Sequence, residues 1–219
     1  MSINIEKTKL VVLDFDGVLA DSGEDIAASI RATQRHFGVR EWNTKDILSF
    51  VGHGAKHIVF NTLAEAGEDK LPEALAFYMA YYQEHTTDFT TLYPGVRDFL
   101  LLLKDRNIPA CVLTNKPEVQ ARKILGELGV EKLFTLVVGP ESVSKMKPDP
   151  EGLKKCMEHA KVAPEETVMV GDAYSDVQTG HNGGTMTCGV LYGIGDREKL
   201  KAEKPDVLVE NRLAEMFGL

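Results

Sequence analysis

The chain has 219 residues, of which 43% are hydrophobic and 26% are charged, so it is long enough to bury a sizeable core. Its 25 basic and 33 acidic residues give a net charge of -8, which argues against nucleic acid or an anionic membrane as a partner, because both favour basic surfaces. An anionic substrate would therefore need positive charge gathered locally, from a metal ion or from a few placed cations.

The sequence carries no signal for export or membrane insertion. Its first residues, MSINIEKTKL, lack the apolar segment of a secretory signal, and no apolar run is long enough to span a bilayer. The cysteines Cys111, Cys156 and Cys188 lie far apart without CxxC spacing, which is typical of free thiols in a reducing compartment. We therefore expect a cytoplasmic protein, either a monomer or a homodimer.

Short apolar runs alternate with helical patterns along most of the chain. Runs rich in β-branched residues predict strands at 10–13, 110–113, 136–138, 168–170 and 207–209. Continuous apolar strands separated by helices predict a parallel sheet with helices on both faces. The expected fold class is therefore α/β, with a Rossmann-like parallel sheet as its core.

One segment, residues 21–92, breaks this alternation because it contains only helical patterning. A helix is predicted to begin near Asp21, with a capping box in its first turn, and another is predicted over 72–89. We expect a helical cap domain at 21–92, inserted after the first strand into an α/β core made of 1–20 and 93–219. Such an insert stands over the carboxyl edge of the sheet, where open α/β folds place their sites.

Acidic side chains follow two of the predicted strands directly. Asp14 and Asp16 come after the first strand and, being two residues apart, can share one face of an extended chain. Asp172 and Asp176 follow the run at 168–170 in the same way. Carboxylates this close repel one another unless a cation is present. Four carboxylates at one sheet edge therefore predict a magnesium site, since Mg²⁺ prefers oxygen ligands.

Two further loops offer groups that bind anions. Thr114 and Asn115 end the strand at 110–113 and precede a predicted helix, so a hydroxyl and free N–H groups meet there. Lys147 stands directly before Pro148 and another predicted helix, where its ammonium could contact a phosphate oxygen. By itself, Thr114 is equally compatible with an ordinary helix start, and a lysine before such a helix is usually a surface residue.

Four segments in this order resemble the motifs of the haloacid dehalogenase-like superfamily. They are DFDGVLADS at 14–22, LTNK at 113–116, KPDP at 147–150 and GDAYSD at 171–176. The resemblance covers essentially the whole chain, and the helical insert is similar to the small helical cap of this superfamily. Asp16 favours phosphoryl chemistry, because the dehalogenases of the superfamily lack an aspartate at that position.

The resemblance implies a role for each strand-end residue. Asp14 would be the nucleophile that forms an aspartyl-phosphate, and Asp16 the general acid and then base. The implied magnesium ligands are Asp14, the Asp16 backbone carbonyl and Asp172, with Asp176 orienting a ligand or a metal-bound water. The implied phosphate-binding groups are Thr114, the Asn115 backbone and Lys147.

The cap segment carries one indication of the substrate. FVGHGA at 50–55 resembles a cap loop of the phosphoglycolate phosphatase group, and its glycines would let the backbone approach a small ligand. We therefore expect substrate contacts from Gly52, His53 and Gly54, although a solvated or helix-capping role for His53 is as compatible with the sequence. The expected substrate is phosphoglycolate or a similar small phosphomonoester.

Two alternatives stay open at this point. A sugar phosphomutase resembling β-phosphoglucomutase would share the motifs and the cap type. A phospho-accepting receiver module, which is not an enzyme, also combines an α/β fold with acidic residues, a threonine and a lysine. The large insert and Asp16 argue against the receiver module.

Overall fold

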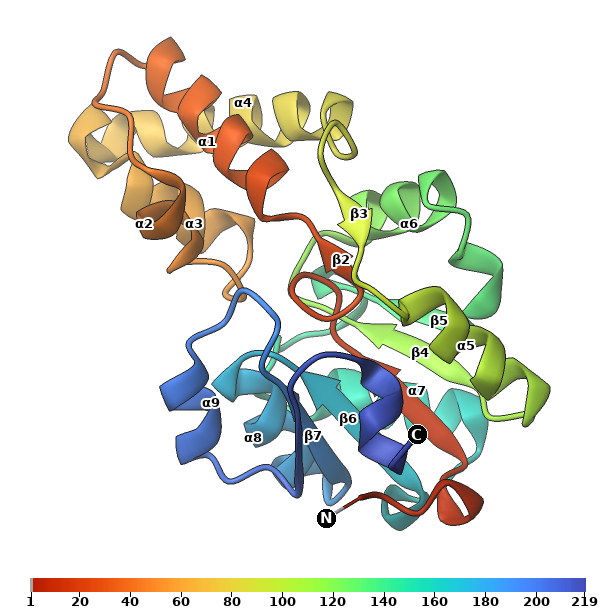
Figure 1. The fold of residues 1–219 in the computed structure, drawn as a ribbon. Coiled ribbons are helices and arrows are strands. Elements are labelled where there is room, and N and C mark those ends of the chain that lie inside the picture. Colours follow the sequence, from red (N-terminus) through yellow and green to blue (C-terminus); the bar gives the residue numbers. More distant parts are fainter. Residues whose placement is uncertain (1) are drawn as a thin grey trace.

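Six strands form one parallel sheet in the computed structural model, which describes residues 2–219 (Figure 1). In spatial order they are β5 (Leu136–Val138), β4 (Ala110–Leu113), β1 (Leu10–Leu13), β6 (Thr167–Gly171), β7 (Met186–Val190) and β8 (Val207–Val209). The chain runs outward from β1 to β4 and β5, and then returns to add β6, β7 and β8 on the other side. The carboxyl ends of β4, β1 and β6 therefore meet where the strand order reverses, which is the usual place for a site in such sheets.

Helices cover both faces of this sheet. Alternate residues of β1 explain this arrangement, because Leu10 and Val12 pack in the cluster that contains Leu153 of α7, whereas Val11 and Leu13 pack in the cluster that contains α5 and α6. The helices are α1 (Gly23–His36), α2 (Thr44–Leu48), α3 (Ala55–Thr62), α4 (Leu71–Glu84), α5 (Val96–Asp105), α6 (Glu118–Glu127), α7 (Glu151–Ala160), α8 (Tyr174–Gly183) and α9 (Arg197–Ala202). The predicted α/β class is confirmed.

Helices α1 to α4 lie between β1 and β4 in the sequence and form a separate group over one edge of the sheet (Figure 1). Two short strands, β2 (Ala20–Asp21) and β3 (Thr91–Leu92), pair antiparallel where the chain enters and leaves this group. Within the group α1 and α3 both pack against α4, and the buried apolar residues of the group are continuous with those of the sheet domain. The exact domain boundaries at 20/21 and 92/93 stay a prediction.

The first and last helices of this group differ from the sequence prediction. Helix α4 ends at Glu84 rather than reaching 89, because the backbone N–H groups of Phe89 and Thr90 donate to the buried Asp25 carboxylate. Asp25 therefore cannot complete a capping box for α1. Ser22 occupies the N-cap position of α1 without a side-chain cap bond, since its hydroxyl donates to Asp16 instead.

Within residues 2–219, no helix combines the length and the apolar character that crossing a membrane requires. This agrees with the absence of a long apolar run in the sequence. The cytoplasmic location and the oligomeric state stay predictions.

Candidate active site

The loop after β1 is held against the neighbouring strand β6. The Asp14 backbone N–H donates to the Val170 carbonyl (2.9 Å), and this bond aligns the two strand ends. Gly17 then turns the chain with a φ of +83°, and a Cβ atom at this position would overlap the Asp172 carboxylate. Glycine is therefore required at 17 both for the left-handed turn and for the close approach of the two loops.

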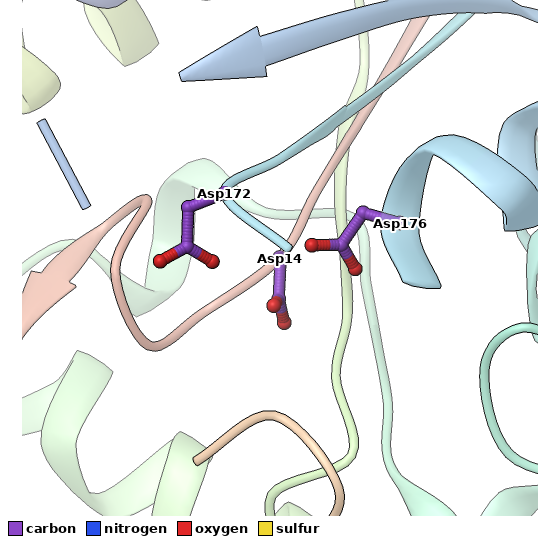
Figure 2. Close-up of side chains that lie close together, drawn as sticks. All are labelled: Asp14, Asp172 and Asp176. Carbon is purple, nitrogen blue, oxygen red and sulfur yellow. The ribbon is translucent and has the colours of Figure 1, made fainter. Parts of the chain in front are cut away.

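Three carboxylates converge at this point (Figure 2). Asp14 follows β1, Asp172 follows β6 and Asp176 lies in the first turn of α8. One oxygen from each lies within 4.8 Å of the others, and all three residues are buried. Backbone groups hold the cluster in place, because Asp172 accepts from the N–H groups of Ile194 (2.7 Å) and Gly195 (2.8 Å).

Lys147 is the buried cation beside this cluster. Its Nζ lies 2.8 Å from Asp14 Oδ1 and 2.6 Å from Asp176 Oδ1. Burial raises the pKa of Asp14 to about 7, with Lys147 acting in the opposite direction, and burial raises the pKa of Asp172 to about 8. Burial by itself would lower the pKa of Lys147, but the charges of Asp14 and Asp176 raise it overall. The ammonium therefore stays charged and neutralises part of the cluster.

The donor set fits a hard divalent cation. Three buried carboxylates face one ammonium group, so the cluster retains negative charge that a metal ion would neutralise. The groups that converge are carboxylate oxygens, which are the ligands that Mg²⁺ and similar ions prefer. Asp14, Asp172 and Asp176 could therefore hold a metal ion.

The Asp16 side chain is directed to different partners. It accepts from the Ser22 hydroxyl and from Lys116 Nζ, which lies 3.0 Å from Oδ1 and 3.2 Å from Oδ2. The same Nζ donates to the Tyr82 hydroxyl on helix α4 (2.7 Å). A chain of polar contacts thus runs from the loop after β1, through the loop after β4, to the helical insert.

The loop after β4 joins the remaining parts of the site. The Asn115 amide donates to the Gly52 carbonyl (2.8 Å), and its Oδ1 accepts from the Lys147 backbone N–H (3.1 Å). The Thr114 hydroxyl accepts from the Lys116 backbone N–H (3.1 Å). Asn115 therefore ties the Lys147 loop and the helical insert to the end of β4.

The FVGHGA segment of the insert lies directly on this edge of the sheet. Besides the Gly52 bond, His53 Nε2 lies 3.0 Å from the Tyr174 hydroxyl at the start of α8. The backbone of Gly54 approaches the Asn115 carbonyl so closely that a Cβ would stand 3.3 Å from it. These contacts hold the insert closed over the strand ends.

Two spaces lie on either side of this segment, and Asp16, Val51 and Gly52 line both. The inner cavity has a volume of about 40 Å³. Its core wall consists of Asp14, Asp16, Thr114, Asn115, Lys116, Pro117 and Gln120. Its cap wall consists of Ile26, Val51, Gly52, Gly54, Ala55, Ile58, Tyr78 and Tyr82. The outer cleft, of about 810 Å³, is lined by Asp172, His53 and Tyr174 among others.

Comparison with known proteins is consistent with this site. The family model described as "Haloacid dehalogenase-like hydrolase" matches residues 11–190. The chain belongs to the haloacid dehalogenase-like hydrolases. A curated phosphoglycolate phosphatase from Chromobacterium violaceum is 34% identical to this hydrolase, over 99% of the chain and 98% of the relative. The prediction of a phosphatase of this family is therefore confirmed.

Solved structures agree with the fold of this hydrolase. A predicted phosphoglycolate phosphatase from Haemophilus somnus superposes with a TM-score of 0.87 at 26% identity, covering 94% of this chain and 95% of that one. A β-phosphoglucomutase from Clostridium difficile gives a TM-score of 0.78 at 20% identity, covering 97% and 93%. At that level of identity, the second likeness concerns the fold alone.

Most site residues predicted from the sequence of this hydrolase meet in the structure. Gly52 and Gly54 line the inner cavity, whereas His53 lines the outer cleft and contacts Tyr174. Sequence reasoning assigned no role to Lys116, although it lies within the LTNK motif, or to Tyr82. The spacing of Tyr78 and Tyr82 by one helical turn was an available signal, since it places both on one face of α4.

Proposed function

We propose that this chain is a magnesium-dependent phosphatase that hydrolyses a small organic phosphomonoester, with phosphoglycolate as the favoured substrate. The observation that carries the proposal is the buried contact of Lys147 with Asp14 and Asp176 beside Asp172, where Asp14 also lines the inner cavity. This arrangement offers a carboxylate for attack and positive charge for the phosphoryl oxygens. The names of the curated relatives support the choice of substrate.

In the first step, an Asp14 oxygen attacks phosphorus while the bond from phosphorus to the ester oxygen breaks. Asp16 gives its proton to that leaving oxygen, and the product alcohol departs. In the second step, Asp16 takes a proton from water, the water oxygen attacks phosphorus, and the bond to Asp14 breaks. Thr114, the Asn115 backbone and Lys147 hold the phosphoryl oxygens through both steps.

Asp14, the Asp16 carbonyl and Asp172 would hold magnesium, with Asp176 as an orienting group. When bound, the ion supplies positive charge that screens the repulsion between the Asp14 carboxylate and the substrate phosphate.

The inner cavity supports a small leaving group. Its volume of about 40 Å³ corresponds to roughly three water molecules, so with the insert closed it admits only a small group. A sugar bisphosphate, which a mutase must hold in two orientations, would need a larger space. We infer that residues 21–92 act as a cap that turns on the β2–β3 pair to admit the substrate.

The test is phosphate release with magnesium from phosphoglycolate, glycerol 3-phosphate and glucose 6-phosphate. The wild-type protein should prefer phosphoglycolate, and Asp14→Asn should lower turnover by roughly four orders of magnitude. Its unfolding midpoint should not fall, because the substitution removes one of three repelling carboxylates. Asp105→Asn, at an exposed position at the end of α5, is the matched control. Turnover near the wild-type rate in Asp14→Asn would exclude Asp14 as the nucleophile.

A further inference from the structure

A buried lysine that the proposed chemistry does not use lies on the leaving-group side of the inner cavity. The Lys116 side chain is 4% exposed, and its ammonium contacts Asp16 and the Tyr82 hydroxyl. It also lies over the Tyr82 ring, 4.5 Å from the ring centre, and 5.6 Å from the centre of Phe15. Such a group is held at a defined position by several contacts rather than left free on the surface.

Lys116 is separate from the lysine assigned to the phosphoryl oxygens. Lys147 contacts Asp14 and Asp176, and Lys116 contacts Asp16. Among the described residues that line the inner cavity, Lys116 is the single one with a positive charge. The facing cap wall consists mostly of apolar side chains, such as Ile26 and Ile58. A carboxylate entering this space would lose hydration and would need a cation to compensate.

We propose that Lys116 and Tyr82 bind the carboxylate of the substrate's leaving group, and that this carboxylate takes the place that the Asp16 side chain occupies in the structure described here. This inference rests on the proposed function and adds to it the residues that select a carboxylated phosphoester.

The contacts place Lys116 at the required distance. If Asp16 gives its proton to the ester oxygen, that oxygen lies within hydrogen-bond distance of Asp16. Before the exchange Asp16 lies 3.0 Å from Lys116 Nζ, and it leaves that position only by rotation about its own side-chain bonds, so the ester oxygen that it protonates stays near the ammonium. In phosphoglycolate a single methylene separates the ester oxygen from the carboxylate, so the carboxylate falls within reach of the same ammonium.

Tyr82 supplies the second contact. Burial raises the pKa of Tyr82 well above its ordinary value, so the side chain is a neutral hydroxyl. Its oxygen accepts from Lys116 and its own proton is available to an incoming carboxylate oxygen. Because Tyr82 lies on α4 and Lys116 on the core, the carboxylate would bridge cap and core and stabilise the closed arrangement.

The exchange also frees Asp16. In this arrangement the Asp16 carboxylate is held by Lys116 and Ser22. Once the substrate carboxylate occupies Lys116, the Asp16 side chain can turn toward the ester oxygen. A substrate without a carboxylate leaves Asp16 paired with Lys116, so it would bind more weakly and would also react more slowly.

The experiment compares phosphoglycolate with ethyl phosphate, in which a methyl group replaces the carboxylate. The wild-type protein should prefer phosphoglycolate in kcat/KM by about 100-fold, as expected for a charge-assisted contact in a buried site. Lys116→Met should reduce this preference to about fivefold or less, and Lys116→Arg should retain most of it. Lys145→Met, at an exposed lysine of the neighbouring loop, is the control with the same change of charge.

A binding measurement separates recognition from any effect on Asp16. Glycolate should inhibit the wild-type protein competitively, and Lys116→Met should raise its inhibition constant by about 100-fold. Inhibition by inorganic phosphate, which binds on the Lys147 side, should change by less than about threefold. Tyr82→Phe, which removes one hydroxyl, should lower the preference for phosphoglycolate by about fivefold.

The outcomes distinguish this inference from the proposed function. Equal losses on both substrates in Lys116→Met, with unchanged glycolate inhibition, would overturn the carboxylate site and leave the phosphatase intact. The same holds if the wild-type protein hydrolyses both esters equally well. If the wild-type protein releases phosphate from neither ester in the presence of magnesium, the proposed function itself fails. If Lys116→Met does not fold, Lys116→Arg and Tyr82→Phe still decide the question.

Discussion

The two walls of the inner cavity differ in how they are built. The core wall, together with the carboxylate cluster behind it, is charged and follows the ends of buried parallel strands, where backbone hydrogen bonds fix Asp14 of the wall and Asp172 of the cluster. The cap wall is mainly apolar and stands on helices joined to the core through a two-residue strand pair. The proposed reacting groups thus lie at the strand ends of the sheet, and the groups proposed to face the leaving group lie on the helical insert.

Polar contacts join the two walls at Asn115, which donates to the Gly52 carbonyl, and at Lys116, which donates to the Tyr82 hydroxyl. Beside them, at the outer cleft, His53 contacts Tyr174. Gly52, His53 and Tyr82 of the insert each contact a residue of the LTNK or GDAYSD segment in the core. Closure of the insert would therefore also order these two segments. We therefore expect the charged groups of the core to determine the rate of the chemical step. We expect the contacts between core and insert to determine the affinity for the substrate and the selectivity among substrates.

The largest effect should come from removing the cation at the core wall. Chelation of divalent metal should lower phosphatase activity by roughly a thousandfold or more, and magnesium should restore it. Asp172→Asn should resist restoration at the same magnesium concentration, because it loses a ligand oxygen. Full activity in the presence of chelator would contradict the interpretation of the carboxylate cluster as a metal site.

The next effect tests the buried ammonium of Lys147, which contacts Asp14 and Asp176 in the carboxylate cluster. Lys147→Met should lower kcat by about 100- to 1,000-fold, as expected when a group that stabilises transition-state charge is removed. Steady-state kinetics with phosphoglycolate measure this loss. A comparable loss in the exposed variant Lys145→Met would mean that net charge matters rather than the position of Lys147.

Stability should also depend on pH through the core wall. The folded-state pKa values of Asp14 (about 7) and Asp172 (about 8) lie above the ordinary value of 3.8, so protonation of both favours the folded state. Without metal, stability should fall as pH rises from about 4 to about 8. Thermal unfolding in chelator should show a midpoint on the order of 10 °C lower at pH 8 than at pH 5.

Magnesium should raise the unfolding midpoint more at pH 8 than at pH 5, because it binds the ionised carboxylates. Asp14→Asn should flatten the dependence measured in chelator. A midpoint that stays constant or rises through this window in the wild-type protein would contradict the assigned pKa shifts.

The smallest effect should come from the contact across the outer cleft. His53→Ala and Tyr174→Phe should each raise KM for phosphoglycolate by about fivefold with little change in kcat, because each removes one hydrogen bond that favours closure. The double variant should resemble either single variant, since the two side chains share that bond. Fully additive losses would show that His53 and Tyr174 act separately.

Most of the sheet could be predicted because its central strands β1, β4 and β6 are buried on both faces and appear in the sequence as continuous apolar runs. The predicted runs coincide with β1, β4, β5 and β8, and β6 extends one residue further at each end. Strand β7 was not predicted, because its sequence MTCGV mixes polar and small residues. Buried Thr187 is tolerated there, since both its N–H and its hydroxyl donate to Asp206 (2.8 Å each).

The helical insert was less predictable because its polar residues bond across the chain. Asp25 fits a capping box by its spacing, yet it accepts from Phe89 and Thr90, which follow it by more than 60 residues. Because the N–H groups of Phe89 and Thr90 donate to Asp25, they are not available for helical hydrogen bonds, and α4 cannot extend to residue 89. Local patterns predict that helices exist here, but distant partners set where they begin and end.

Residue order along the chain was sufficient for the family, the parallel sheet and the four loops that carry Asp14, Thr114, Lys147 and Asp172, because strand-end motifs depend on neighbouring residues. The partners of Lys116 and His53 depended on the folded chain. Lys116 meets Asp16 across 100 positions, and His53 meets Tyr174 across 121. The first contact joins two loops of the core and the second joins the insert to the core, and local sequence carries no information on which distant side chain will lie within hydrogen-bond distance.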